Sequence, residues 1–94
     1  MNQQFYSIAY DIPDDKRRRK LAKILESYGQ RVQYSVFEME LPPALIQKLR
    51  QEMTPFCLPD TDQLRIYTLC KQCLKKTEVI GKQPLCLDPD YYWV

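Results

Sequence analysis

The residues best suited to chemistry lie near the amino terminus, in the stretch YDIPDDKRRRKL (residues 10–21). Asp11 follows an apolar-leaning run, where a carboxylate is costly to desolvate unless a cation, a hydrogen-bonding cap or a metal accompanies it. Carboxylate oxygens are the ligands that hard divalent cations such as Mg²⁺ and Mn²⁺ prefer. Asp11 can equally accept the backbone N–H groups of the following turn, so both roles stay open on the residues alone.

Five cations follow the acids, in the run KRRRK (residues 16–20). Three consecutive arginines cover most of a helical turn, so Arg17, Arg18 and Arg19 cannot all point the same way. One or two of them must lean toward the sheet edge or the Asp11 end. Guanidinium groups match phosphate oxygens in a two-pronged fashion, so the run suits a nucleic-acid backbone. A solvated helix face is the alternative interpretation.

The chain contains no histidine. Imidazole general bases and the Cys-His and Ser-His-Asp schemes are therefore excluded within it, which leaves a carboxylate, metal-bound water or lysine to move protons. Tyr10, Tyr34 and Phe37 can stack on bases. Aromatic residues in strands belong to the core more often than to a binding surface.

Four cysteines are present, at positions 57, 70, 73 and 86. Four thiolates can form a tetrahedral zinc site. Only Cys70 and Cys73 form a close pair, in the motif CKQC, so we favour buried or idle thiols over Zn²⁺ on Cys57, Cys70, Cys73 and Cys86. A redox pair is a further alternative, although its usual setting, after a strand and at a helix start, is only half met.

Length and composition indicate one domain over residues 1–94, with 45% hydrophobic and 28% charged residues. The formal net charge is only +2, so any preference for a polyanion must come from the placement of the cations. No apolar window of about 18 residues and no signal pattern is present, which predicts neither a membrane span nor secretion. We therefore expect a cytoplasmic protein.

The elements that hold the candidate residues follow from the spacing of apolar side chains. Residues 4–12 alternate loosely, which predicts a strand with one fully apolar face. That face consists of Tyr6, Ile8, Tyr10 and Ile12. Asp14 can cap a following helix, and Gly29 is expected to end it. The apolar stripe of this helix consists of Leu21, Ile24, Leu25 and Tyr28.

The rest of the chain predicts three more strands and one more helix. RVQYSVFEMEL (residues 31–41) is rich in β-branched and aromatic residues and predicts one strand covered on both faces along its middle. ALIQKLRQEM (44–53) predicts a short helix, and QLRIYTLC (63–70) predicts a strand. EVIG (78–81) predicts a last short strand, after the cationic link KQCLKKT (71–77).

The simplest architecture for these elements is a ferredoxin-like α+β fold, β-α-β-β-α-β, with both helices on one sheet face. The segments predicted above run β-α-β-α-β-β, so compared with this pattern one strand is missing after the first helix. The other sheet face then lacks a cover, and it is expected to carry Ala9, Asp11, Ser35 and Phe37. A partly apolar open face implies a partner, most economically a second copy. The aromatic tail LDPDYYWV (87–94) must also be buried, in its own sheet or the partner's.

Face-to-face packing of two copies can bring two Asp11 carboxylates together across the two-fold axis. Like charges at short range need a counter-ion or a shared proton. Mg²⁺ or Mn²⁺ suits oxygen ligands supplied one per subunit, with water and a substrate phosphate in the other positions. In outline, this is a phosphodiester-cleaving arrangement.

Residues 10–38 resemble the start of the small CRISPR-associated endoribonuclease family, the partner of the adaptation integrase in prokaryotic antiviral immunity. The hallmarks are a strand ending in YDI, a helix opening with acids and arginines, and RVQYSVFE on the second strand. The resemblance continues through LRIYTLC and EVIG, so it covers nearly the whole chain. It implies a ferredoxin-like homodimer in which a segment of about residues 78–94 reaches over to the partner sheet.

The resemblance also implies a Mg²⁺ site built from Asp11 of both subunits. The residues that the family uses near the substrate map by the motif onto Tyr10, Arg18, Arg31, Ser35 and Phe37. Lys20 departs from the pattern, because arginine also occurs at that position in the family and lysine lacks the planar fork.

Two functions follow from the resemblance. The chain is either a metal-dependent nuclease that cuts single-stranded RNA or duplex DNA, or a scaffold. The scaffold would bridge two integrase dimers and hold the spacer duplex through phosphate contacts. A zinc-stabilised RNA-binding module is a third alternative, which requires one Zn²⁺ per chain.

Overall fold

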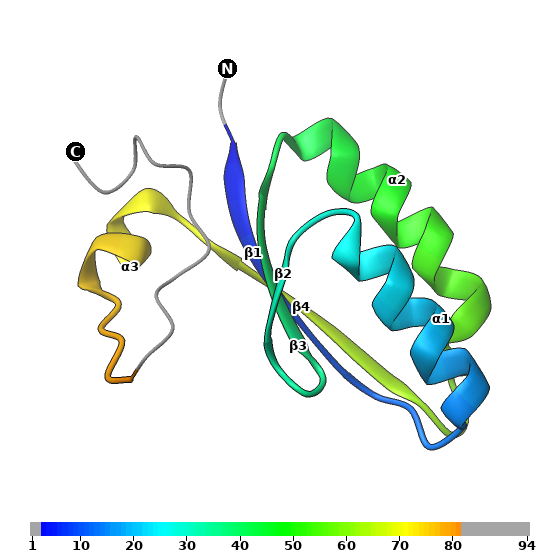
Figure 1. Cartoon of the computed structure of the whole chain (residues 1–94). Helices are drawn as coiled ribbons and strands as arrows, with labels where there is room; N and C mark the ends of the chain where they lie inside the picture. The colour runs from blue at the N-terminus through cyan, green and yellow to red at the C-terminus, as the bar shows by residue number, and fades with distance from the viewer. Residues whose placement is uncertain (1–2, 82–94) are drawn as a thin grey trace.

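Four strands and two long helices form the fold that a computed structural model gives for residues 3–81. The elements are β1 (Gln4–Asp11), α1 (Asp15–Glu26), β2 (Gln30–Gln33), β3 (Val36–Leu41), α2 (Pro43–Met53), the 3₁₀ turn η1 (Thr54–Phe56), β4 (Gln63–Leu69) and α3 (Lys71–Lys76). The strands make one antiparallel sheet in the order β2-β3-β1-β4 (Figure 1). This order confirms the predicted α+β class with β-α-β-β-α-β connectivity.

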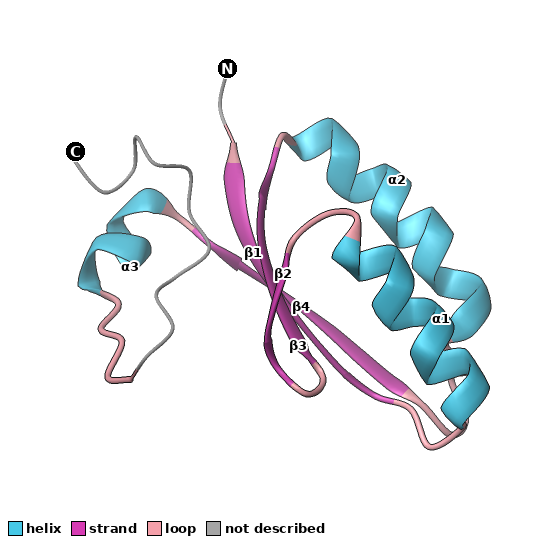
Figure 2. Ribbon diagram, viewed as in Figure 1, coloured by secondary structure: helices cyan, strands magenta, loops and turns pink. Residues whose placement is uncertain are grey.

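Helices α1 and α2 lie side by side on one face of the sheet (Figure 2). The Asp14 carboxylate caps α1 as predicted, by accepting the N–H of Arg17 at 2.9 Å. Pro43 occupies the first turn of α2, where its missing N–H costs no hydrogen bond. The side chains that the two helices bury are Leu21, Ala22 and Leu25 from α1 and Ile46, Leu49 and Met53 from α2.

The core lies between these helices and alternate residues of the central strands. Its sheet side consists of Tyr6, Ile8 and Tyr10 from β1 and Phe37, Met39 and Leu41 from β3, all at most 6% exposed. Ile12 completes the predicted apolar face of the first strand. The residues between them point to the opposite face, where Tyr67 of β4 is 48% exposed.

Two sequence predictions about secondary structure are wrong. Residues 31–41 do not form one strand, because the chain turns at Tyr34 and Ser35 and pairs β2 with β3 as an antiparallel hairpin. The expected cationic link is the short helix α3, and residues 78–81 form no strand within the described part of the chain. Residues 82–94, which hold most of the predicted exchanged segment, lie outside the described residues.

Gly29 has a different role from the predicted helix stop. Helix α1 ends at Glu26 with Ser27 as its C-cap, and Gly29 does not have a positive φ. A Cβ atom at Gly29 would lie 2.3 Å from the Glu38 carbonyl oxygen and 2.6 Å from the Met39 Cβ. Glycine is therefore required because the turn after α1 passes directly against β3.

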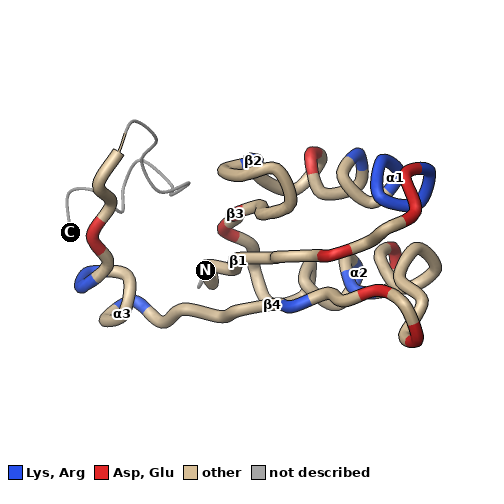
Figure 3. The backbone as a smooth tube through the Cα atoms, turned by 90° about the horizontal axis from the view of Figure 1, so that it is seen from below, with Lys and Arg blue, Asp and Glu red and all other residues tan. Residues whose placement is uncertain are grey.

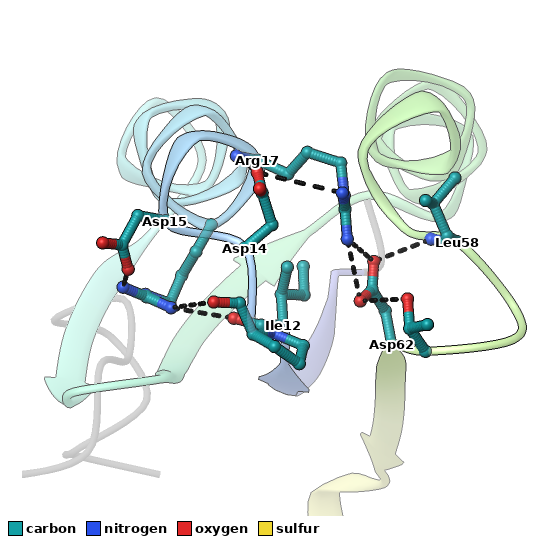
Figure 4. Close-up of polar contacts among 9 residues, drawn as sticks. Ile12, Asp14, Asp15, Arg17, Leu58 and Asp62 are labelled. Carbon is teal, nitrogen blue, oxygen red and sulfur yellow. Dashed lines mark hydrogen bonds and ion pairs between the residues drawn. The ribbon is translucent and has the colours of Figure 1, made fainter.

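A partly buried ion pair connects α1 to the loop before β4 (Figure 4). The Arg17 guanidinium donates from Nη2 to both Asp62 carboxylate oxygens, at 3.0 and 2.9 Å. Asp62 also accepts the Leu58 N–H at 2.8 Å and the Thr61 hydroxyl at 3.0 Å, and its side chain has no exposed surface. The Leu58 N–H, together with Arg17 and Thr61, holds the pKa of Asp62 below its usual value, although burial acts in the opposite direction.

Among the residues that the structure describes, no helix has both the length and the apolar character needed to cross a bilayer.

We expect Gly29→Ala to lower the free energy of unfolding by at least about 1–3 kcal/mol, because the new methyl group would overlap a backbone carbonyl. In a chain of this size, each kcal/mol corresponds to a fall in Tm of roughly 4–8 °C. Ser27→Ala, an exposed change in the same turn, is the control and should stay within about 0.5 kcal/mol of wild type. Equal unfolding curves for the two variants would contradict the close-approach role of Gly29.

We expect Asp62→Asn to destabilise the protein most at neutral pH. Because folding lowers the pKa of Asp62, its contribution is present above the ordinary aspartate pKa of about 3.9 and is lost as pH falls through the lower folded value. The stability difference between wild type and variant should therefore shrink on acidification to about pH 3, which urea unfolding at both pH values measures. Asp60→Asn, an exposed change in the same loop, is the control. A difference that is independent of pH would rule out this linkage.

Candidate functional site

Asp11 is the last residue of β1, and its side chain is exposed on the sheet face opposite the helices. It pairs in register with Gln63, the first residue of β4, and Ala9 precedes it on the same face. No group of three or more His, Cys, Asp or Glu side chains in the described residues lies close enough together to hold a metal ion. A single chain therefore provides one exposed carboxylate, that of Asp11, as a possible metal ligand on the sheet face opposite the helices.

Tyr10, the residue beside Asp11, points the other way, into the core. Its ring stacks on Phe37 with centroids 6.4 Å apart. The Arg31 guanidinium carbon lies 5.2 Å from the centre of the Phe37 ring. Burial raises the pKa of Tyr10, and the nearby Arg31 guanidinium partly opposes this effect. Tyr10, Arg31 and Phe37 thus form one cluster on the helix side of the sheet, and the prediction that Phe37 lies on the open face is wrong.

The predicted basic run divides among different partners, and Figure 3 shows its charges gathered on α1. Arg17 is held by Asp62 as described above. Arg18 donates from Nη1 to the Ile12 carbonyl at 2.8 Å and to the Pro13 carbonyl at 3.3 Å (Figure 4). Its Nη2 also forms an ion pair with Asp15. Arg18 therefore fixes the turn that directly follows Asp11.

Arg19 is the arginine of the run that remains available to a ligand. Its side chain is exposed and makes no hydrogen bond or ion pair with the described part of the chain. Lys16 is exposed as well. Lys20, the position that departs from the family pattern, lies over the Phe56 ring, with its Nζ 5.9 Å from the centroid.

Ser35 and Tyr34 form the turn of the β2–β3 hairpin. The Tyr10 N–H donates to the Ser35 carbonyl at 3.1 Å, so this turn extends the pairing of β1 to the residue before Asp11. Tyr34 is 71% exposed and lies under the Arg18 guanidinium, whose carbon is 5.9 Å from the ring centroid. Of the three aromatic residues considered for base stacking, Tyr34 alone is exposed, because Tyr10 and Phe37 are core residues.

Asp62 is the important residue that sequence reasoning missed. It lies 45 positions from Arg17, in the turn-rich segment TPFCLPDTD (residues 54–62). No periodicity or motif connects two residues so far apart, so only the tertiary structure shows that Asp62 neutralises Arg17.

The three cysteines that the structure describes lie in other elements than Asp11. Cys57 is half-buried and follows η1, and burial raises its pKa. Cys70 and Cys73 are exposed at the start of α3, and Cys86 lies outside the described residues.

Comparisons with known proteins agree on one family. Residues 4–77 match the family model for CRISPR associated protein Cas2. The CRISPR-associated endoribonuclease Cas2 3 of Synechocystis is 45% identical over 84 residues, which cover 89% of this chain and 91% of that protein. The CRISPR-associated endonuclease Cas2 2 of Thermus thermophilus is 47% identical, with 90% of each chain covered.

One of the solved structures similar to this chain belongs to a larger complex. A chain in a partial Cas6-RT-Cas1–Cas2 complex is 34% identical to this chain and has a TM-score of 0.63. The match covers 82% of this chain and 90% of that chain. Sequence and fold thus lead to the same conclusion, that this chain belongs to the Cas2 family of CRISPR-associated proteins.

Proposed function

We propose that this chain is a metal-dependent nuclease of CRISPR adaptation, which hydrolyses phosphodiester bonds in single-stranded RNA or duplex DNA. The observation that carries the proposal is the exposed Asp11 carboxylate, at the end of a central strand and beside the cationic start of α1. The names of the relatives, an endoribonuclease and an endonuclease, support nuclease chemistry and leave the choice between RNA and DNA open.

We infer that two copies pair through the sheet face that carries Asp11. This face mixes small, apolar and charged side chains, which suits a second sheet better than water. It includes Ser7, Ala9 and Asp11 from β1, Val36 and Glu38 from β3, and Arg65 and Tyr67 from β4. Phe5 of β1 lies on the same face but is only 1% exposed, so it is already buried within the chain. Such pairing would place one Asp11 from each copy near the two-fold axis. The segment of about residues 78–94 would contribute to the same interface.

The donor set fits Mg²⁺ or Mn²⁺. Two Asp11 carboxylates would provide hard oxygen ligands, and water and a substrate phosphate would occupy the remaining positions. Bound there, the metal would supply an activated water and charge neutralisation at the phosphate. The absence of histidine from the chain agrees with a mechanism in which a side-chain imidazole takes no part.

The surrounding residues have distinct roles in this proposal. Arg19 and Lys16 would bind phosphate oxygens, since both are exposed on α1. Arg18 would act as a positioning residue, because its contacts to the Ile12 and Pro13 carbonyls fix the turn after Asp11. The Tyr10, Arg31 and Phe37 cluster would support the end of β1 from the core side.

A non-catalytic scaffold is the second candidate function. The similarity to a chain in a complex that contains Cas1 favours it, because a Cas2 dimer could bridge integrase dimers and bind spacer DNA through phosphate contacts. The two functions use the same dimer and the same basic helix. They differ in whether Asp11 holds a metal that takes part in cleavage.

We expect Asp11→Ala to reduce metal-dependent cleavage by more than about 100-fold, because it removes a direct metal ligand from each copy. Labelled single-stranded RNA and duplex DNA are incubated with wild type and variant in Mg²⁺, in Mn²⁺ and in chelator. Size-exclusion chromatography checks that the variant has the same oligomeric state as wild type. Asp60→Ala, an exposed acid in the loop before β4, should cleave at the wild-type rate.

If Asp11→Ala cleaves at the wild-type rate, Asp11 is rejected as the metal ligand. No cleavage by wild type with either metal would reject the nuclease and leave the scaffold as the function.

We expect Arg18→Lys to impair cleavage without impairing binding. A lysine ammonium keeps the charge, yet it cannot reproduce the forked contacts to the Ile12 carbonyl and Asp15. The cleavage rate at saturating substrate should therefore fall about tenfold or more, whereas the Kd should change little. Arg19→Ala should raise the Kd and change the saturated cleavage rate little. It should also reduce the slope of log affinity against log salt concentration by about one. A weakened Kd with an unchanged saturated rate for Arg18→Lys would make Arg18 a phosphate contact instead.

A further inference from the structure

The CKQC motif lies at a junction between a strand and a helix. Strand β4 ends at Leu69, Cys70 is the N-cap of α3, and Cys73 lies in the first turn of that helix. The sequence alone suggested that this setting was only half met, because residues 71–77 were expected to form a link. Both thiols are exposed. The junction thus presents two solvent-accessible sulfurs on one turn of chain.

The Cys70 side chain contacts the backbone of Cys73. Cys70 Sγ accepts the N–H of Cys73 at 3.4 Å, which holds its sulfur over the first turn of α3. Cys73 lies three positions after this N-cap, in the first turn of α3, where N-cap side chains reach the helix backbone, so the two sulfurs can meet without unwinding α3.

The local hydrogen bonds make the two thiols unequal. The backbone N–H and the thiol of Cys73 lower the pKa of Cys70. Contact with Cys70 raises the pKa of Cys73. An exposed cysteine with a lowered pKa is the usual attacking thiol of a pair, and its neighbour is the resolving thiol.

We propose that Cys70 and Cys73 form a reversible dithiol–disulfide site that reacts with small-molecule disulfides of the glutathione type. In the first step, the Cys70 thiolate attacks one sulfur of the small disulfide, forms a mixed disulfide and releases one thiolate. In the second step, the Cys73 thiolate attacks Cys70 Sγ and releases the other thiolate. The two cysteine protons pass to the two released thiolates, so two protein thiols are oxidised and one small disulfide is reduced.

This site is separate from the proposed phosphodiester chemistry. Asp11 pairs with Gln63 at the start of β4, whereas Cys70 follows its end. Seven residues of extended strand span about 23 Å. The proposal therefore stands on the cysteine pair alone and does not depend on nuclease activity.

The test equilibrates the full-length protein with mixtures of reduced and oxidised glutathione, followed by alkylation, intact mass measurement and peptide mapping. We expect a loss of two hydrogens and joint protection of Cys70 and Cys73, both reversed by excess reduced glutathione. With an aromatic disulfide reagent at neutral pH, Cys70 should react at least about tenfold faster than Cys57. Cys57 is the internal control because burial raises its pKa.

Single-cysteine variants identify the attacking sulfur. Cys73→Ser should accumulate a mixed disulfide with glutathione on Cys70, and Cys70→Ser should accumulate much less on Cys73. Cys86→Ser should leave the reaction unchanged. The proposal is overturned if the pair stays reduced in oxidised glutathione, or if Cys70 or Cys73 pairs with Cys86 or with another chain.

Discussion

β1 lies in the centre of the sheet, paired with β3 and β4, and its alternating side chains must satisfy two different surroundings. Tyr6, Ile8 and Tyr10 fill the core beneath the two helices. The residues between them face the uncovered side, and the strand ends on that side with Asp11. A shift of one residue would bury this carboxylate and expose the core tyrosines. The packing of Tyr10 on Phe37 therefore fixes where Asp11 can act.

The arginines of α1 show how one charge cluster is divided into structural and available parts. Asp62 neutralises Arg17, and the carbonyls of the turn after Asp11 occupy Arg18. Arg19 has no such partner in the described part of the chain and remains exposed. Only part of the apparent positive charge can therefore meet a phosphate backbone. This division also explains why so basic a helix begins with two acids, one of which caps the helix while the other binds Arg18.

Short-range patterns predicted the two long helices, the first strand and the Asp14 cap, because helix and strand periodicities survive in local sequence. The β2–β3 hairpin was missed because its turn, Tyr34 and Ser35, contains none of the glycine or asparagine signals of a tight turn. That turn also reverses the expected face of Phe37. The ion pair between Arg17 and Asp62 could not be predicted, since it depends on how α1 packs against a distant loop. The exposure of Asp11 was predicted from alternation alone.

We propose that Asp11 from two copies holds one divalent metal ion. A titration of Mn²⁺ into the purified protein, followed by electron paramagnetic resonance, measures the number of bound ions directly and does not depend on cleavage. We expect one tightly bound Mn²⁺ per two chains, and its loss in a dimeric Asp11→Asn variant. One ion per single chain, or undiminished binding in Asp11→Asn, would contradict it.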